Sequence, residues 1–196
     1  MTRIVAVTMC AGLLSALLLG MPSIAIAGGA PVKLYNKSIT VHWSEDRSQK
    51  QTDGTAFSRV THVDLGIYIS NAGRLFRQLG RTVTNSRGKV VASGGTSAAP
   101  DGSIIQANKN KYSSTFQFIG RSLTGTTMYE SGARRITITF DDGFRSCNVS
   151  ISHGKEDGAP GLVMHSVSGR FYMLTSISIS GASCSLQDGN IFGGAG

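Results

Sequence analysis

Hydrophobic and polar residues alternate along several short stretches of the chain. In residues 37–43, Ile39, Val41 and Trp43 form one face and polar side chains form the other. Residues 60–69 repeat this pattern, since their odd positions are mostly apolar. A period of two is typical of a β-strand with one face buried. Both stretches are therefore predicted to be strands, and Trp43 is predicted to pack in the core rather than to stack on a sugar.

A first hairpin is predicted where a tight turn joins two of these strands. Residues 71–73 (Asn-Ala-Gly) connect the strand at 60–69 to another at 74–83. The second strand alternates less cleanly, because Arg77 and Arg81 occupy positions of the apolar face.

A second hairpin is predicted later in the chain. Residues 135–140 (RITITF) and 145–151 (RSCNVSI) alternate, and Asp-Asp-Gly stands between them at 141–143. Glycine in third place suits the positive φ that a three-residue hairpin loop needs. Further strands are predicted at 114–123, 170–180 and 183–187, and polar loops at 44–55, 93–101 and 153–161.

The number and spacing of these strands predict the fold class. About eight strands, starting roughly every 10 to 15 residues and without helical periodicity, are typical of an all-β protein. We expect a single-domain antiparallel β-sandwich or small β-barrel over residues 28–192. Residues 193–196 are expected to form a flexible, glycine-rich tail.

Residues 1–27 have the features of a secretory signal peptide. Arg3 precedes an apolar stretch at 4–19, and Ala25-Ile26-Ala27 has the small residues that signal peptidase recognises. We expect cleavage after Ala27 and an extracytoplasmic location, either periplasmic or secreted. The rest of the chain has no second apolar run long enough for a membrane-spanning helix, so no transmembrane segment is expected in the mature chain.

The cysteines predict one disulfide. Of the three in the chain, Cys10 lies in the leader, which leaves Cys147 and Cys184. An exported protein with two cysteines and no CxxC motif is expected to use them structurally. We therefore predict a Cys147–Cys184 bond.

Positive charge is the main functional signal in the sequence. The chain has 19 Lys and Arg against 11 Asp and Glu, a formal net charge of +8. A band of clustered cations attracts anionic polymers. Basic hairpins of this kind commonly serve only to keep a protein soluble, and that remains the simpler interpretation. The functional hypothesis is an exported, non-catalytic domain that binds anionic envelope polysaccharide or lipid head groups. No nucleic-acid partner is expected, since no binding motif accompanies the charge. The band comprises Arg74, Arg77, Arg81, Arg87 and Lys89.

The sequence contains no complete catalytic or metal-binding motif. The histidines form neither an HxH nor an HExxH pattern, and acidic neighbours such as Glu45-Asp46 are interpreted as turn residues. No catalytic residue, metal ligand or cofactor is predicted. The alternative hypothesis is a small secreted hydrolase whose catalytic residues come together only in the fold. Its candidates are His153, Glu156 and Asp157, with Ser97 or His42.

Overall fold

The chain folds as strands in two layers. The computed structural model describes residues 29–51, 53–101, 112–113, 116–129, 132–154 and 172–193. Within them lie eleven β-strands and one short 3₁₀ helix, η1 (Val32–Leu34). The all-β fold class is confirmed, and no helix of these segments is long and apolar enough to cross a membrane. The predicted leader, its cleavage site and residues 194–196 lie outside the described residues.

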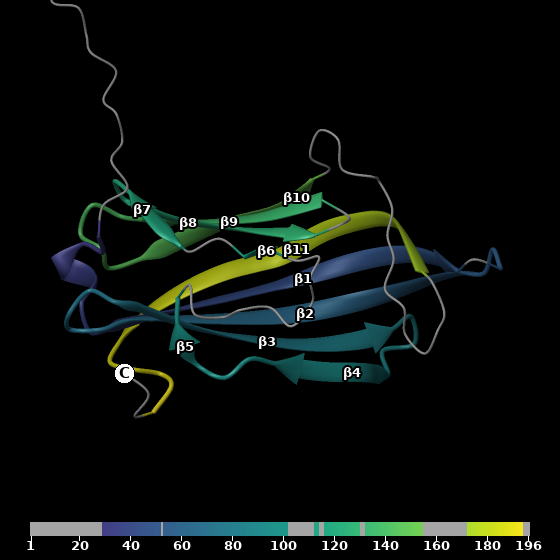
Figure 1. The fold of residues 1–196 in the computed structure, drawn as a ribbon, viewed down its shortest axis with the longest axis horizontal. Helices are drawn as coiled ribbons and strands as arrows, with labels where there is room; N and C mark the ends of the chain where they lie inside the picture. The colour runs from purple at the N-terminus through teal and green to yellow at the C-terminus, as the bar shows by residue number, and fades with distance from the viewer. Residues whose placement is uncertain are drawn as a thin grey trace, which may run out of the picture.

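The larger layer is a six-stranded antiparallel sheet (Figure 1). Its strands run in the order β11-β1-β2-β3-β4, and β5 pairs with β3 beside β4. The predicted hairpin of residues 60–69 and 74–83 is the β2–β3 pair, with Ile69 opposite Leu75. The strands are β1 (Lys37–Gln51), β2 (Ala56–Ile69), β3 (Leu75–Asn85), β4 (Val90–Gly95), β5 (Ala99–Pro100) and β11 (Tyr172–Asp188).

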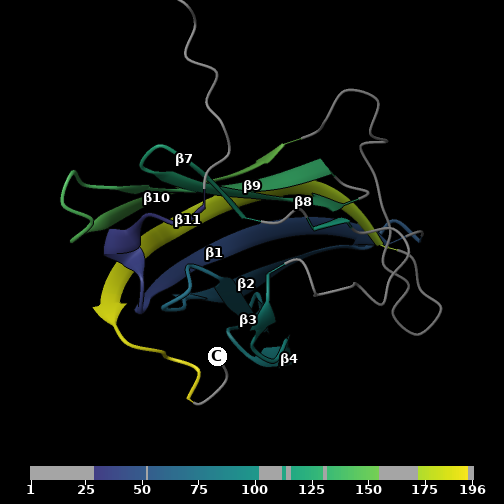
Figure 2. The same cartoon turned by 60° about the vertical axis from the view of Figure 1, so that its left-hand side comes forward.

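The smaller layer is a five-stranded antiparallel sheet that covers part of the larger one. Its order is β10-β9-β8-β6, and β7 also pairs with β8. Figure 2 shows the long strands β1 and β11 curving beneath it, the arrangement of a β-sandwich. The strands are β6 (Tyr112–Ser113), β7 (Gln117–Ile119), β8 (Ser122–Tyr129), β9 (Gly132–Phe140) and β10 (Cys147–Gly154).

The core lies between the two layers and follows the predicted alternation. Ile39, Val41 and Trp43 of β1 are all at most 2% exposed. They pack with inward side chains of the second sheet, including Ile138 and Phe140 of β9. Trp43 is thus a core residue, as the sequence predicted.

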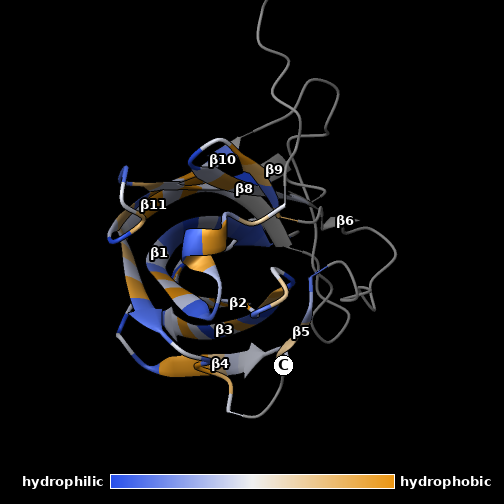
Figure 3. Cartoon of the chain, turned by 90° about the vertical axis from the view of Figure 1, so that its left-hand side faces the viewer, coloured by the Kyte–Doolittle hydropathy of each residue, from blue (hydrophilic) through white to orange (hydrophobic). Residues whose placement is uncertain are grey.

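The predicted disulfide joins the two layers at one edge. Cys147 on β10 and Cys184 on β11 are bonded, with 5.8 Å between their Cα atoms. Each strand ends its own sheet, and Figure 3 shows the two side by side. The bond therefore closes this side of the sandwich.

Two boundaries predicted from the sequence are wrong. Residues 44–51 continue β1 instead of forming a loop, because β1 stays paired on both sides to its end. The strands predicted at 170–180 and 183–187 are one strand, β11. Gly181, with φ of +61°, lies at a β-bulge that lets β11 bend without breaking.

The structure also differs from the prediction at one loop, one strand and one hairpin turn. The 93–101 segment contains the end of β4 and all of β5, and 114–123 contains β7 and the start of β8. The β9–β10 turn takes six residues, and Phe144 rather than glycine has the positive φ, 54°. Its ring lies 5.7 Å from that of Phe140, so core packing holds this backbone conformation.

Candidate anion-binding surface on β3 and β4

Four of the five predicted cations are exposed on β3 and its flanking turns. Arg74 lies in the turn before β3, and Arg87 and Lys89 lie in the β3–β4 turn. Arg81 is on the inward face of β3, opposite the buried Val63, yet it is exposed. β3 has eleven residues and is about 36 Å long. Arg74 is therefore a strand's length away from the β3–β4 turn, whereas the other three cations share one hairpin.

Arg77, the fifth cation, is not on this surface. Its side chain is 10% exposed, and Nε lies 2.9 Å from Oδ1 of Asp101, which is 7% exposed. The guanidinium also lies 5.8 Å above the ring of Phe116. The structure therefore places Arg77 in a buried ion pair between Arg74 and Arg81, and it interrupts the band expected from the sequence.

The β3–β4 turn has a defined conformation that positions two of the cations. Oδ1 of Asn85 accepts hydrogen bonds from the backbone N–H groups of Arg87 and Lys89, each at 3.0 Å. The N–H of Gly88 donates to the carbonyl of Asn85, and Gly88 has a φ of +74°. A side-chain acceptor and a left-handed glycine are typical of a tight hairpin turn. We call Arg81, Arg87 and Lys89 the hairpin cations.

The stretch of sequence that carries the hairpin cations has no acidic residue. Residues 65–100 hold five cations and no Asp or Glu. None of the four exposed cations forms an ion pair with any residue that the structure describes. Other surface cations are paired: Lys37 lies 2.5 Å from Asp188, and Arg121 contacts Asp142. The hairpin cations differ from these in having no ion-pair partner among the described residues.

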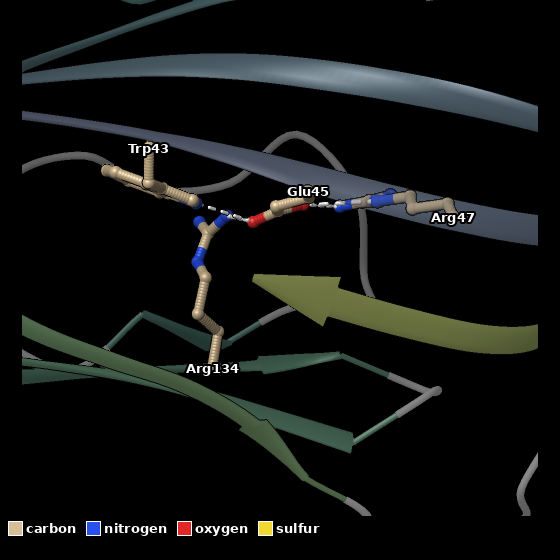
Figure 4. A network of polar contacts seen from close by, with 4 residues as sticks. All are labelled: Trp43, Glu45, Arg47 and Arg134. Carbon is tan, nitrogen blue, oxygen red and sulfur yellow. Dashed lines mark hydrogen bonds and ion pairs between the residues drawn. The ribbon is translucent and has the colours of Figure 1, made fainter. Parts of the chain in front are cut away.

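A second charged cluster lies inside the sandwich (Figure 4). Glu45 is fully buried on β1, where Oε1 accepts a 3.0 Å hydrogen bond from Nε1 of Trp43. Arg134 reaches across from β9, with Nη1 2.8 Å from the same oxygen. Arg47 donates from Nε to Oε2 at 3.1 Å. The guanidinium of Arg134 also lies 5.3 Å above the ring of Trp43, so the cluster joins the two sheets.

These contacts keep Glu45 ionised. Burial alone would raise the pKa of Glu45, but the positive charges of Arg47 and Arg134 and the hydrogen bonds from Trp43 and Arg134 outweigh it. Together they lower the pKa from 4.5 to about 2. A fully enclosed carboxylate held by two arginines is suited to holding the sheets together rather than to proton transfer.

The hydrolase candidates that the structure describes lie in separate places. His153 is on β10 opposite Arg134, on the inward side of its sheet, whereas His42 is on the outward face of β1. Ser97 is exposed between β4 and β5. Glu156 and Asp157 lie outside the described residues. The structure thus does not bring the described members of the set together.

The outward face of β1 and β2 holds a polar cluster that the sequence analysis missed. Ser44 Oγ lies 2.9 Å from Nδ1 of His62, and Nδ1 of His42 lies 2.5 Å from Oδ1 of Asp64. A serine–histidine–acid relay needs one histidine to contact both partners. Here Asp64 binds the other histidine, so the four side chains form two separate pairs on an exposed sheet.

Neither a metal-ligand cluster nor a relative assigns a function. Within the described ranges, no group of three or more His, Cys, Asp and Glu side chains could hold a metal ion. The chain matches no protein-family model, and no significant match was found among the curated proteins or the solved structures. The function is therefore inferred from the charge and geometry of the chain's own residues.

Proposed function

We propose that this chain is an exported, non-catalytic β-domain that binds an anionic component of the cell envelope or cell surface through the hairpin cations. The observation that carries the proposal is the exposure of Arg81, Arg87 and Lys89 on a segment without carboxylates. The ordered turn around Asn85 supports it, because a backbone that is already held by hydrogen bonds loses less conformational freedom on binding.

Arg74 contributes less in this proposal, and Arg77 contributes nothing directly. Arg74 lies about 36 Å from the β3–β4 turn, several times the Debye length of about 8 Å, so it acts independently of that turn at physiological salt. Arg77 is already neutralised by Asp101. The binding surface is therefore the hairpin of β3 and β4 instead of the hairpin of β2 and β3.

The alternative of a small secreted hydrolase has less support. Its described candidates, His42, Ser97 and His153, occupy an outward face, a connection and an inward face. The buried Glu45 has a low pKa, whereas a general acid near neutral pH needs a raised one. Neither the three described candidates nor Glu45 therefore supplies a general acid and a general base that face each other.

The test is binding of the protein, expressed from its full coding sequence and purified, to immobilised dextran sulfate and to neutral dextran. We expect binding to dextran sulfate only, weakening between about 50 mM and about 300 mM NaCl. An Arg81→Gln, Arg87→Gln, Lys89→Gln variant is expected to lose most of it. Equal binding to both polymers, or an unaffected variant, would overturn the proposal.

A further inference from the structure

The strand that follows the hairpin cations begins with two exposed hydrophobic residues. Val90 and Val91 come directly after Lys89 and are 55% and 46% exposed. Few large hydrophobic side chains of the described chain are as open. Figure 3 shows the hydrophobic start of β4 at the margin of the larger sheet, next to the hydrophilic β3–β4 turn.

The exposure follows from the pairing of β4. Thr84 pairs with Val90 and Val83 with Ala92, so Val91 is the extra residue of a bulge and has no partner on β3. β4 is also the last strand on its side of the sheet order, with pairing on one edge only in the described part of the chain. The valines therefore stay accessible beside the two cations of the turn.

We propose that this hairpin docks on an anionic lipid surface. Arg87 and Lys89 contact the phosphate groups of the lipids, and Val90 and Val91 enter the interface between the head groups and the acyl chains. The inference rests on the proposed function and narrows its ligand. A charged polysaccharide would satisfy the cations but offers no apolar phase for the valines, whereas a lipid surface offers both.

The open edge of β4 limits how deep the hairpin can lie. Backbone N–H and C=O groups on this edge that have no partner in the described part of the chain would find none in hydrocarbon, where they are costly to bury. At the level of the head groups, water and phosphate oxygens can satisfy them. The structure thus fits a peripheral contact in which only the valine side chains leave water.

The cations and the valines are expected to contribute separately to the affinity for the vesicles. A basic residue near an anionic membrane contributes about fivefold in affinity, so losing Arg87 and Lys89 is expected to weaken binding about 25-fold. Exchanging both valines for threonine keeps β-branching and strand propensity but replaces methyl groups with hydroxyls. We expect this change to weaken vesicle binding about tenfold.

The experiment measures binding of the purified protein to vesicles of phosphatidylcholine, with and without about 30% phosphatidylglycerol. Dextran sulfate and polyglutamate serve as soluble anions. The wild type is compared with Val90→Thr, Val91→Thr and with Arg87→Gln, Lys89→Gln. A Val91→Trp variant reports the environment of the strand by its fluorescence, and thermal unfolding shows that each variant is folded.

We expect salt-sensitive binding to the anionic vesicles. Both the valine-to-threonine pair and the Arg87→Gln, Lys89→Gln pair should weaken it. The threonine variant should bind dextran sulfate as the wild type does, and Val91→Trp should shift its emission to the blue with vesicles only.

Unchanged vesicle binding by the threonine variant would overturn the lipid inference and leave the proposed function standing. Unchanged binding of every anion by the Arg87, Lys89 variant would remove the proposed function itself. If the protein bound polyglutamate more tightly than the anionic vesicles, and lost that binding in the threonine variant, the lipid inference would be overturned. The ligand would then be an acidic protein segment.

Discussion

Arg134 on β9 places its Nη1 atom 2.8 Å from Oε1 of Glu45 on β1, and both side chains are almost completely buried. This ion pair joins the two sheets through the interior, while the disulfide joins them at the edge. Breaking a buried pair by removing one charge is costly, because the other charge is left without compensation.

Replacing Glu45 by Gln is expected to destabilise the fold by about 3 to 5 kcal/mol. Arg47 and Arg134 would then face each other without the carboxylate between them. Asp46→Asn is the matched control, since Asp46 is the exposed neighbour and should change stability by about 0.5 kcal/mol or less. Urea unfolding measures the stability of both variants. Equal free energies of unfolding for Glu45→Gln and Asp46→Asn would contradict the structural role of Glu45.

The stability supplied by Glu45 depends on pH. Its pKa falls from 4.5 to about 2 on folding, so its contribution is fully present above pH 4.5 and is lost as the pH falls toward 2. The difference in unfolding free energy between wild type and Glu45→Gln should therefore shrink by about 3 kcal/mol across this interval. Urea unfolding at several pH values checks this, and a constant difference would rule it out.

Removing the disulfide is expected to cost about 4 kcal/mol on the chain-entropy account, because the bond closes a loop with a sequence separation of 37. The double variant Cys147→Ser, Cys184→Ser should show this loss in denaturant unfolding. Reducing agent should destabilise the wild type and leave the double variant unaffected. A similar response of both proteins would show that the bond does not form.

Arg77→Gln and Arg74→Gln are expected to change the free energy of unfolding by different amounts. Arg77→Gln leaves Asp101 buried without its cation, so we expect a loss of about 3 kcal/mol in unfolding free energy. Arg74→Gln removes an exposed charge and should change stability by less than about 0.5 kcal/mol. If thermal unfolding of the two variants were the same, Arg77 would not be in a buried pair.

The strands were predictable where hydrophobic and polar residues alternate along the chain. Ile39, Val41 and Trp43 have the period of two, and all three are buried as that period requires. The same parity continues to Glu45, which is why Glu45 points inward and Asp46 outward. A pair of adjacent acids resembles a turn in sequence. The inward position of Glu45 is tolerable because Arg134, 89 residues away, contacts its carboxylate together with Arg47 and Trp43.

The candidate surface was predictable in part. The run of cations was visible in the sequence, and so was the position of Arg77 on the apolar side of its strand. Asp101, 24 residues later, is what decides that Arg77 is buried while Arg81 is exposed. Such a pairing depends on how β5 returns beside β3, which no local pattern records. The absence of carboxylates from 65–100 was available without the structure and is the stronger signal.

The central claim is that the location of the charge, and not its total, produces binding to anions. The direct test compares two variants of equal net charge on vesicles containing phosphatidylglycerol over a range of salt concentrations. One replaces the hairpin cations by Gln, and the other replaces Lys33, Arg135 and Arg145, which are exposed on η1, β9 and the β9–β10 turn. We predict that the first loses binding and its salt dependence, while the second stays close to wild type. Equal losses in the two variants would show that net charge alone attracts the anion and would contradict the account.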